Sequence, residues 1–136
     1  MKQKQLVIFS GILAIIMLFS GIFLLTGFNP LTIFESDNIS VTKLHSMLDG
    51  NYQFVDIRTA SEYNAEHIDE FTINLDFYQF ENNLSMLNVL DKEKPTIIIC
   101  NSGNRSNIAY SLMKDYGFKQ VYNVLGGIQA WWNKYE

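Results

Sequence analysis

The single cysteine of the chain has the surroundings of a nucleophile. Cys100 follows the apolar run 96–99 and precedes the small polar segment 101–106, after which a helical pattern begins. A strand end that leads into a helix N-terminus presents free backbone N–H groups and positive partial charge to whatever lies in the loop. Such a place favours the thiolate, which is the reactive form of cysteine. Cys100 is therefore the candidate catalytic residue.

The segment after Cys100 is built from residues suited to binding an anion. Gly103 permits positive φ angles, Asn101 and Asn104 tolerate a left-handed backbone, and the serines add donors. Such a turn can form a nest of N–H groups, whereas the position alone favours a buried, unreactive cysteine. Arg105 either pairs with an anionic donor or the thiolate, or begins the helix and points to solvent. The candidate substrate-binding residues are Asn101, Ser102, Gly103, Asn104, Arg105 and Ser106.

The N-terminal part of the sequence has the properties of a membrane-spanning segment. The 23 residues 6–28 carry no charge, and a helix of that length can cross a hydrocarbon core of about 30 Å. Lysines precede the segment while Glu35 and Asp37 follow it, which places the N-terminus in the cytoplasm. We expect residues 1–28 to be an uncleaved single-pass anchor with the C-terminal domain extracytoplasmic. A secretory signal peptide is the alternative, although its apolar stretch usually spans only about 7–15 residues.

Charge and cysteine content restrict the possible partners. Ten Lys and Arg stand against fourteen Asp and Glu, a formal net charge of −4, and two of the lysines precede the apolar segment, so the remainder is more acidic still. An acidic surface argues against a nucleic-acid partner. A single cysteine can form no internal disulfide, which makes an unpaired thiol outside the cytoplasm a candidate for chemistry.

After a linker at residues 29–38, the pattern predicts alternating strands and helices. Strands are expected at 54–57, 72–75, 96–99 and 121–124. Helices are expected from Ser40 to Gly50, from a cap at Thr59 or Ser61 to about Glu66, and at 78–90. A fourth helix is expected along the apolar stripe Ile108, Leu112 and Tyr116, ending at Gly117. A fifth follows Gly126-Gly127 and carries Ile128, Trp131 and Trp132. Such alternation implies a parallel sheet with helices on both faces. Ligands bind such sheets beyond the carboxyl ends of the strands, where Asp56, Arg58 and the loop after Cys100 should meet.

Three stretches, in this order and spacing, resemble one known family. They are Val55-Asp56-Ile57-Arg58-Thr59 with Glu62-Tyr63 and His67-Ile68, then 100–106, and then Gly117-Phe118 through Val121-Tyr122-Asn123 to Gly126-Gly127-Ile128 and Trp131. Together they resemble the rhodanese-like domain, a single-domain sulfurtransferase module. The resemblance covers residues 39–136. It implies an α/β three-layer sandwich with a mainly parallel five-stranded sheet.

The resemblance also implies a reaction. In the family, the cysteine equivalent to Cys100 takes a sulfane sulfur from thiosulfate or a persulfide, holds it as an enzyme persulfide and passes it to an acceptor thiol or cyanide. The loop amides of 101–106 can stabilise a persulfide anion without a metal or an organic cofactor. The family gives Asp56 and Arg58 supporting roles and His67 a structural one. The implied partners are a sulfur donor, an acceptor thiol and the membrane.

The sequence departs from the family at two places. Asn101 stands where many relatives have Arg, which favours a persulfide over the dianion thiosulfate. Residues 69–71 replace the Pro-Gly-Ala of many relatives, so that turn should differ.

Two alternative functions remain. Phosphatases and arsenate reductases of the same fold use Cys-x5-Arg, whereas Cys100 and Arg105 have the spacing Cys-x4-Arg, and a smaller cradle suits one sulfur atom. A non-catalytic, membrane-tethered binding module is the other alternative, and the presence of Cys100 argues against it. Its contact patch would be Trp131, Trp132 and Tyr135, although such aromatic spacing is more typical of core packing.

Overall fold

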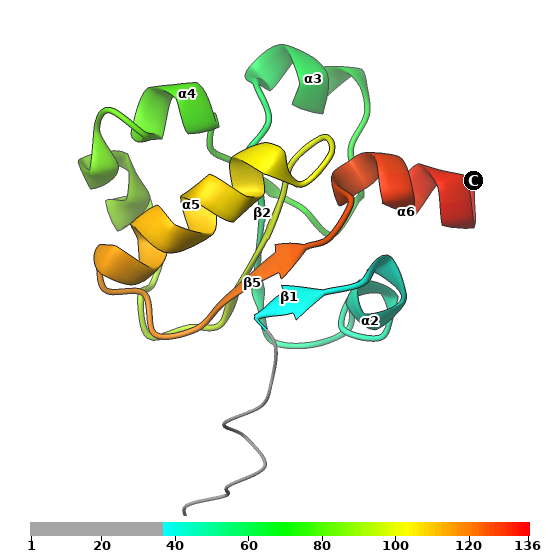
Figure 1. Ribbon diagram of the computed structural model, residues 1–136, viewed down its shortest axis with the longest axis horizontal. Coiled ribbons are helices and arrows are strands. Elements are labelled where there is room, and N and C mark those ends of the chain that lie inside the picture. The colour runs from blue at the N-terminus through cyan, green and yellow to red at the C-terminus, as the bar shows by residue number, and fades with distance from the viewer. Residues whose placement is uncertain (1–36) are drawn as a thin grey trace, which may run out of the picture. The chain divides into compact units, whose positions relative to one another are not determined.

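The computed structural model of the protein describes residues 37–136 (Figure 1). The elements in order are β1 (Asn38–Ile39), α2 (Val41–His45), β2 (Gln53–Asp56), α3 (Ala60–Ala65), β3 (Ile73–Asn74), α4 (Phe77–Phe80), the 3-10 helix η2 (Leu84–Val89), β4 (Thr96–Ile99), α5 (Asn104–Asp115), β5 (Val121–Val124) and α6 (Gly127–Tyr135). The expected membrane segment 6–28 and residues 29–36 of the linker lie outside the described residues. Among the helices of residues 37–136, none is long and apolar enough to cross a membrane.

The strands form one five-stranded sheet in the order β1-β5-β4-β2-β3, and neighbouring strands are parallel. Asp56 at the end of β2 lies opposite Ile99 at the end of β4, so the two chains leave the sheet at the same edge. The predicted parallel five-stranded fold is confirmed. The sequence did not predict β1, which has only two residues and includes Asn38 from the expected linker.

Helices cover both faces of the sheet. On one face, α4, η2 and α5 pack over Val55 and Ile98; on the other, α2 and α6 pack over Ile97 and Ile99. All four residues of β4 are buried, which explains the continuous apolar run of this central strand. By contrast, α3 buries no residue. Figure 1 shows α3 at the edge of the sheet where the loop before α5 also emerges.

Side-chain caps determine where the early helices begin and end. The Ser40 side chain accepts a hydrogen bond from the Lys43 amide, and α2 ends at His45 rather than near Gly50, because the Ser46 hydroxyl bonds back to the Lys43 carbonyl. Of the two predicted caps for α3, Thr59 is the one used.

The predicted helix at 78–90 is wrong. The chain forms the short α4, breaks, and then forms η2. Asn83 has an extended φ of −146° at the break, and asparagine disfavours a helix interior because its side chain competes for backbone hydrogen bonds. The apolar spacing still predicted the buried side chains correctly, since Phe80 and Leu87 both lie in the core.

The predicted buried stripe of α5 is also displaced around the helix. Ile108 is 54% exposed, and the buried residues are Ser106, Ala109 and Met113. The cause is the start of the helix, where Ser106 faces the sulfur of Cys100 and so turns a different side of the helix toward the sheet.

Candidate active site

Cys100 stands directly after β4, and its sulfur is surrounded by hydrogen-bond donors. The Sγ atom accepts from the Gly103 amide at 3.1 Å and from the Ser106 amide at 3.4 Å. The Ser106 hydroxyl lies 3.4 Å from the sulfur and donates to the Gly103 carbonyl. The residue is only 1% exposed. The thiol is thus as buried as an ordinary core cysteine, but it lies among donors that stabilise negative charge.

The loop has further backbone N–H groups with no acceptor among residues 37–136. Gly103 has a left-handed φ of 98° at the start of α5, as expected for a glycine in a tight turn. No residue of 37–136 accepts a hydrogen bond from the backbone amides of Ser102, Asn104 or Arg105. The side chains of Asn101, Ser102 and Asn104 are at least partly exposed. Of the predicted substrate-binding residues, Gly103 and Ser106 thus bind the sulfur, and three others keep amides that could bind an anion.

Contacts with α6 fix the orientation of the first two amides of the loop, those of Asn101 and Ser102. The Ile128 amide donates to the Cys100 carbonyl at 2.8 Å, and the Gln129 amide donates to the Asn101 carbonyl at 3.1 Å. In a trans peptide the C=O and N–H groups point in opposite directions. Because α6 binds these two carbonyls, the amides of Asn101 and Ser102, which belong to the same peptide groups, point away from α6.

Only a glycine allows this approach. Gly127 has φ +58°, and a Cβ there would lie 2.5 Å from the Cys100 carbonyl oxygen. Sequence reasoning assigned Gly126-Gly127 a turn and missed this role.

Arg105 is held in a bidentate ion pair with Glu62 of α3. Its Nη1 and Nη2 atoms lie 2.9 and 2.7 Å from the two carboxylate oxygens, and its guanidinium lies 5.5 Å from the centre of the Tyr78 ring. The hydrogen bond from Arg105 lowers the pKa of Glu62 to about 2, and the same bond raises the pKa of Arg105. Arg105 therefore does not point freely to solvent.

Glu62 was not among the predicted site residues. Glu62 belongs to one of the stretches that resemble the family, and the spacing Thr59-x-x-Glu62 is typical of a capping box. The structure confirms that box, with the Thr59 amide and hydroxyl both donating to Glu62 Oε2. The cap signal does not indicate the second partner, because Arg105 lies 43 residues further along the chain.

Asp56 and Arg58 brace the same edge of the sheet. They form a buried ion pair with Nη2 and Oδ2 2.7 Å apart. Arg58 also donates to the Glu66 carbonyl, and the Asn74 side chain donates to the carbonyls of both Asp56 and Arg58. No hydrogen bond of their side chains within the described part of the chain reaches the loop. His67 bonds through Nδ1 to the Tyr63 carbonyl and stacks on the Tyr63 ring.

An open hollow of about 480 Å³ lies beside the loop. Its lining contains no charged residue and includes the asparagines 38, 104, 107 and 123. The side-chain oxygen of Asn123 is buried without a hydrogen-bond partner in residues 37–136. In the same residues no group of three or more His, Cys, Asp or Glu side chains could hold a metal ion.

The comparison with known families now decides the classification. The rhodanese-like domain matches residues 40–134, which is most of the chain. The chain belongs to the rhodanese-like domain family. Residues 40–134 include both the sulfur loop and Gly127, so the site lies inside this rhodanese-like domain.

Relatives and solved structures agree with this assignment. The chain is 32% identical over 96 residues to a protein named thiosulfate sulfurtransferase GlpE from Shewanella oneidensis, with 69% of this chain and 90% of that protein covered. It is 33% identical over 106 residues to rhodanese-like domain-containing protein 17 of Arabidopsis thaliana, covering 71% and 68%. The crystal structure of a rhodanese-related protein from Thermoplasma volcanium matches with a TM-score of 0.62 and 26% identity, covering 72% of this chain and 92% of that one.

Proposed function

We propose that this rhodanese-like domain is a sulfurtransferase in which Cys100 carries the transferred sulfur as a persulfide. The observation that carries the proposal is the cradle of the Cys100 sulfur, which receives hydrogen bonds from the Gly103 and Ser106 amides. Such donors stabilise a sulfur anion before and after it gains one sulfur atom. The likeness to a thiosulfate sulfurtransferase supports the same reaction class.

In the first half-reaction the Cys100 thiolate attacks a sulfane sulfur. With thiosulfate, the S–S bond breaks and sulfite leaves with the bonding electron pair. With a protonated persulfide RSSH, the thiolate attacks the terminal sulfur and the thiolate RS⁻ leaves, while the proton stays on the new Cys100 persulfide until water removes it. Both donors leave Cys100 with one added sulfur, as expected for covalent catalysis by a cysteine.

In the second half-reaction an acceptor thiolate attacks the outer sulfur of the Cys100 persulfide. A new S–S bond forms in the acceptor, and the Cys100 thiolate leaves with the electron pair of the bond that breaks. The loop amides then hold the returning negative charge, so the site needs no metal or organic cofactor for either step.

The test is a direct measurement of sulfur on Cys100. Purified full-length protein in detergent is incubated with thiosulfate or with 2-hydroxyethyl persulfide, and its intact mass is measured. We expect the gain of one sulfur atom, located on Cys100 by peptide analysis and removed by an added thiol. The Cys100→Ser variant should gain none. Absence of the added mass with both donors would contradict the proposal, and hydrolysis of a phosphate ester by the same protein would favour a phosphatase.

We also propose that residues 6–28 anchor the protein in a membrane with the domain on the extracytoplasmic side. The support comes from the sequence: an uncharged stretch of 23 residues, preceded by lysines and followed by acidic residues. A tethered domain would meet its sulfur donor and acceptor thiol at the membrane surface.

A further inference from the structure

We propose that Glu62 sets the donor specificity of the site: by neutralising Arg105, it favours weakly charged donors, such as alkyl persulfides, over the dianion thiosulfate. The inference rests on the proposed function, because it concerns which donor delivers sulfur to Cys100. It assigns Glu62 as a positioning residue that acts through Arg105.

The guanidinium of Arg105 is already occupied by a carboxylate. Two of its nitrogens bind the two oxygens of Glu62 in a fork-to-fork pair, the geometry in which a guanidinium best binds an anion. An incoming oxyanion would have to compete with a carboxylate fixed in place. Glu62 is itself fixed, because Thr59 donates to it from both its amide and its hydroxyl.

An incoming donor meets little net positive charge at this edge of the sheet. The carboxylate of Glu62 and the guanidinium of Arg105 cancel at this edge of the sheet, and the other cation there, Arg58, is neutralised by Asp56. The Cys100 thiolate adds a negative charge of its own. A dianion is therefore attracted only by the loop amides, while a neutral, protonated persulfide meets no repulsion.

Removing the charge of Glu62 leaves Arg105 with an unbalanced positive charge near the donor. For a unit charge on the order of one residue diameter from the donor in a largely wet site, Coulomb attraction raises the capture of a dianion by about tenfold. Because Coulomb energy is proportional to charge, a monoanionic donor gains only the square root, about threefold, and a neutral donor gains nothing.

The decisive variant is Glu62→Gln. The glutamine oxygen can still accept from the Thr59 amide, so the cap of α3 is kept while the charge is lost. We expect kcat/KM for thiosulfate to rise about tenfold and the value for 2-hydroxyethyl persulfide to rise threefold or less. The gain should lie mainly in KM, and it should shrink as ionic strength rises, because salt screens exposed charges.

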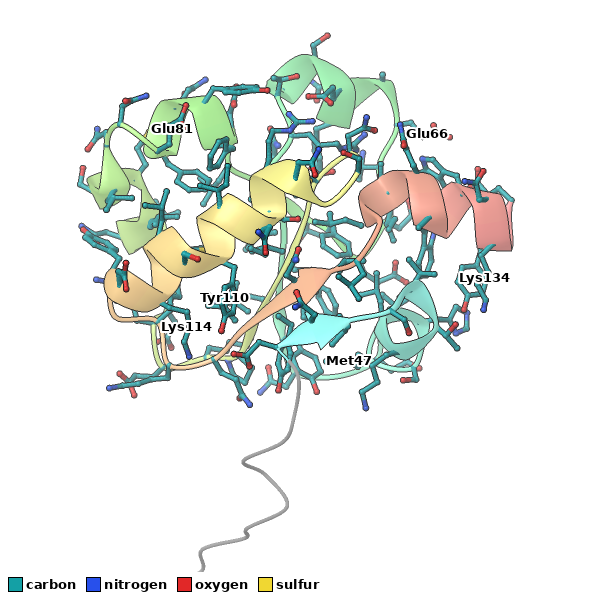
Figure 2. All side chains as sticks on the ribbon, in the orientation of Figure 1. Met47, Glu66, Glu81, Tyr110, Lys114 and Lys134 are labelled. Atoms are coloured by element: carbon teal, nitrogen blue, oxygen red, sulfur yellow. The ribbon has the colours of Figure 1, made fainter. Side chains whose placement is uncertain are left out.

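Two further variants separate this role from a structural one. Glu66→Gln removes the same charge just after α3 (Figure 2) but leaves the Arg105 pair intact, so the ratio of the two donors should not change. Arg105→Gln leaves Glu62 as an unbalanced anion, so thiosulfate use should fall about tenfold. The double variant restores neutrality and should return to about the wild-type ratio.

The outcomes are distinct. A donor ratio that is unchanged in Glu62→Gln, or that changes equally in Glu66→Gln, overturns the inference while leaving the sulfurtransferase proposal intact. If Glu62→Gln folds poorly and loses transfer from both donors, the Arg105→Gln ratio decides instead, and an unchanged ratio overturns the inference. Failure of every variant and of the wild type to load Cys100 is the separate failure of the proposed function.

Discussion

The sulfur of Cys100 and the carboxylate of Glu62 both accept hydrogen bonds, but their donors differ in kind. Cys100 needs donors and receives them from backbone amides, which remain after any substitution other than proline. Glu62 needs a cation and receives it from one side chain, Arg105. The properties of the carboxylate are therefore the ones that a single substitution or a change of pH alters most directly.

Stability should depend on pH through Glu62. Folding lowers its pKa from 4.5 to about 2, so the folded state favours the carboxylate. This contribution is fully present above pH 4.5 and is lost as the pH falls toward 2. Urea unfolding should find Glu62→Gln less stable than the wild type at pH 7, with a smaller difference at pH 3. The Glu66→Gln variant should not show this pattern, and a difference independent of pH would contradict the assignment.

At this scale the sequence predicted the tight turn of donors beside Cys100, which the structure shows, but not the partner of Arg105. The loop is contiguous, so the types and order of residues 100–106 indicate a tight turn of donors without knowledge of the fold. Glu62 meets Arg105 because β2 and β4 end at the same edge of the sheet. The spacing of residues along the sequence does not show that these two side chains are close in space. The near-complete burial of Cys100 agrees with its position after an apolar strand, which by itself favours a buried cysteine.

Among the elements, α6 does more than cover a face of the sheet. Its first turn binds the carbonyls of Cys100 and Asn101 and so orients the loop that holds the sulfur. The sequence predicted this helix. Ile128 and Trp131 are buried as expected, whereas Trp132 is only partly buried and Tyr135 is exposed. Its contact with the loop could not be predicted, because a Gly-Gly pair indicates a turn equally well with or without a close neighbour.

Gly127→Ala should therefore damage the site more than it damages the fold. The new Cβ would lie 2.5 Å from the Cys100 carbonyl oxygen and would push the loop out of position. Gly117→Ala is the matched control, because φ is +101° there but the nearest neighbouring atom is 4.0 Å away. Each variant should lose about 1–3 kcal/mol of unfolding free energy through backbone strain.

Only Gly127→Ala should also load sulfur onto Cys100 more slowly, by more than tenfold. Urea unfolding and the time course of the mass gain measure the two effects. Sulfur loading at the wild-type rate in Gly127→Ala would show that α6 does not orient the loop.

The broken helix shows the limit of periodicity as a predictor of elements. Spacing by three and four identified the buried side chains of α4 and η2 correctly, because both helix types bring such residues to one side. Periodicity does not reveal a change from one helix type to another, and the asparagines at 82 and 83 were the local signal of the break.

For the whole molecule, the alternation of elements was enough to predict the parallel sheet and its two helical layers. What it omitted is β1, whose two residues are too few to carry a period. This strand pairs with β5 at one edge of the sheet, and the Asp37 side chain beside it accepts a hydrogen bond from the Tyr110 hydroxyl, which raises the pKa of Tyr110 to about 12. Figure 2 shows Tyr110 on the part of α5 that lies over these strands.

The proposed anchor predicts where the full chain resides in a cell. Produced in bacteria, it should sediment with membranes and resist extraction by alkaline carbonate, whereas a variant lacking residues 6–28 should not. Protease added to intact protoplasts should digest the domain, because the proposed orientation places it outside. Extraction by carbonate would contradict the anchor, and survival of the domain in protoplasts, with digestion after lysis, would contradict the orientation.

The loop at residues 100–106 contacts Gly127, Ile128 and Gln129, which are made later than the loop during synthesis. During synthesis Cys100 leaves the ribosome before the helix that holds its carbonyl. A nascent chain that already contains all five strands still lacks the contacts that hold the carbonyls of Cys100 and Asn101. The loop beside the thiol therefore takes its final form late, after most of the chain has been made.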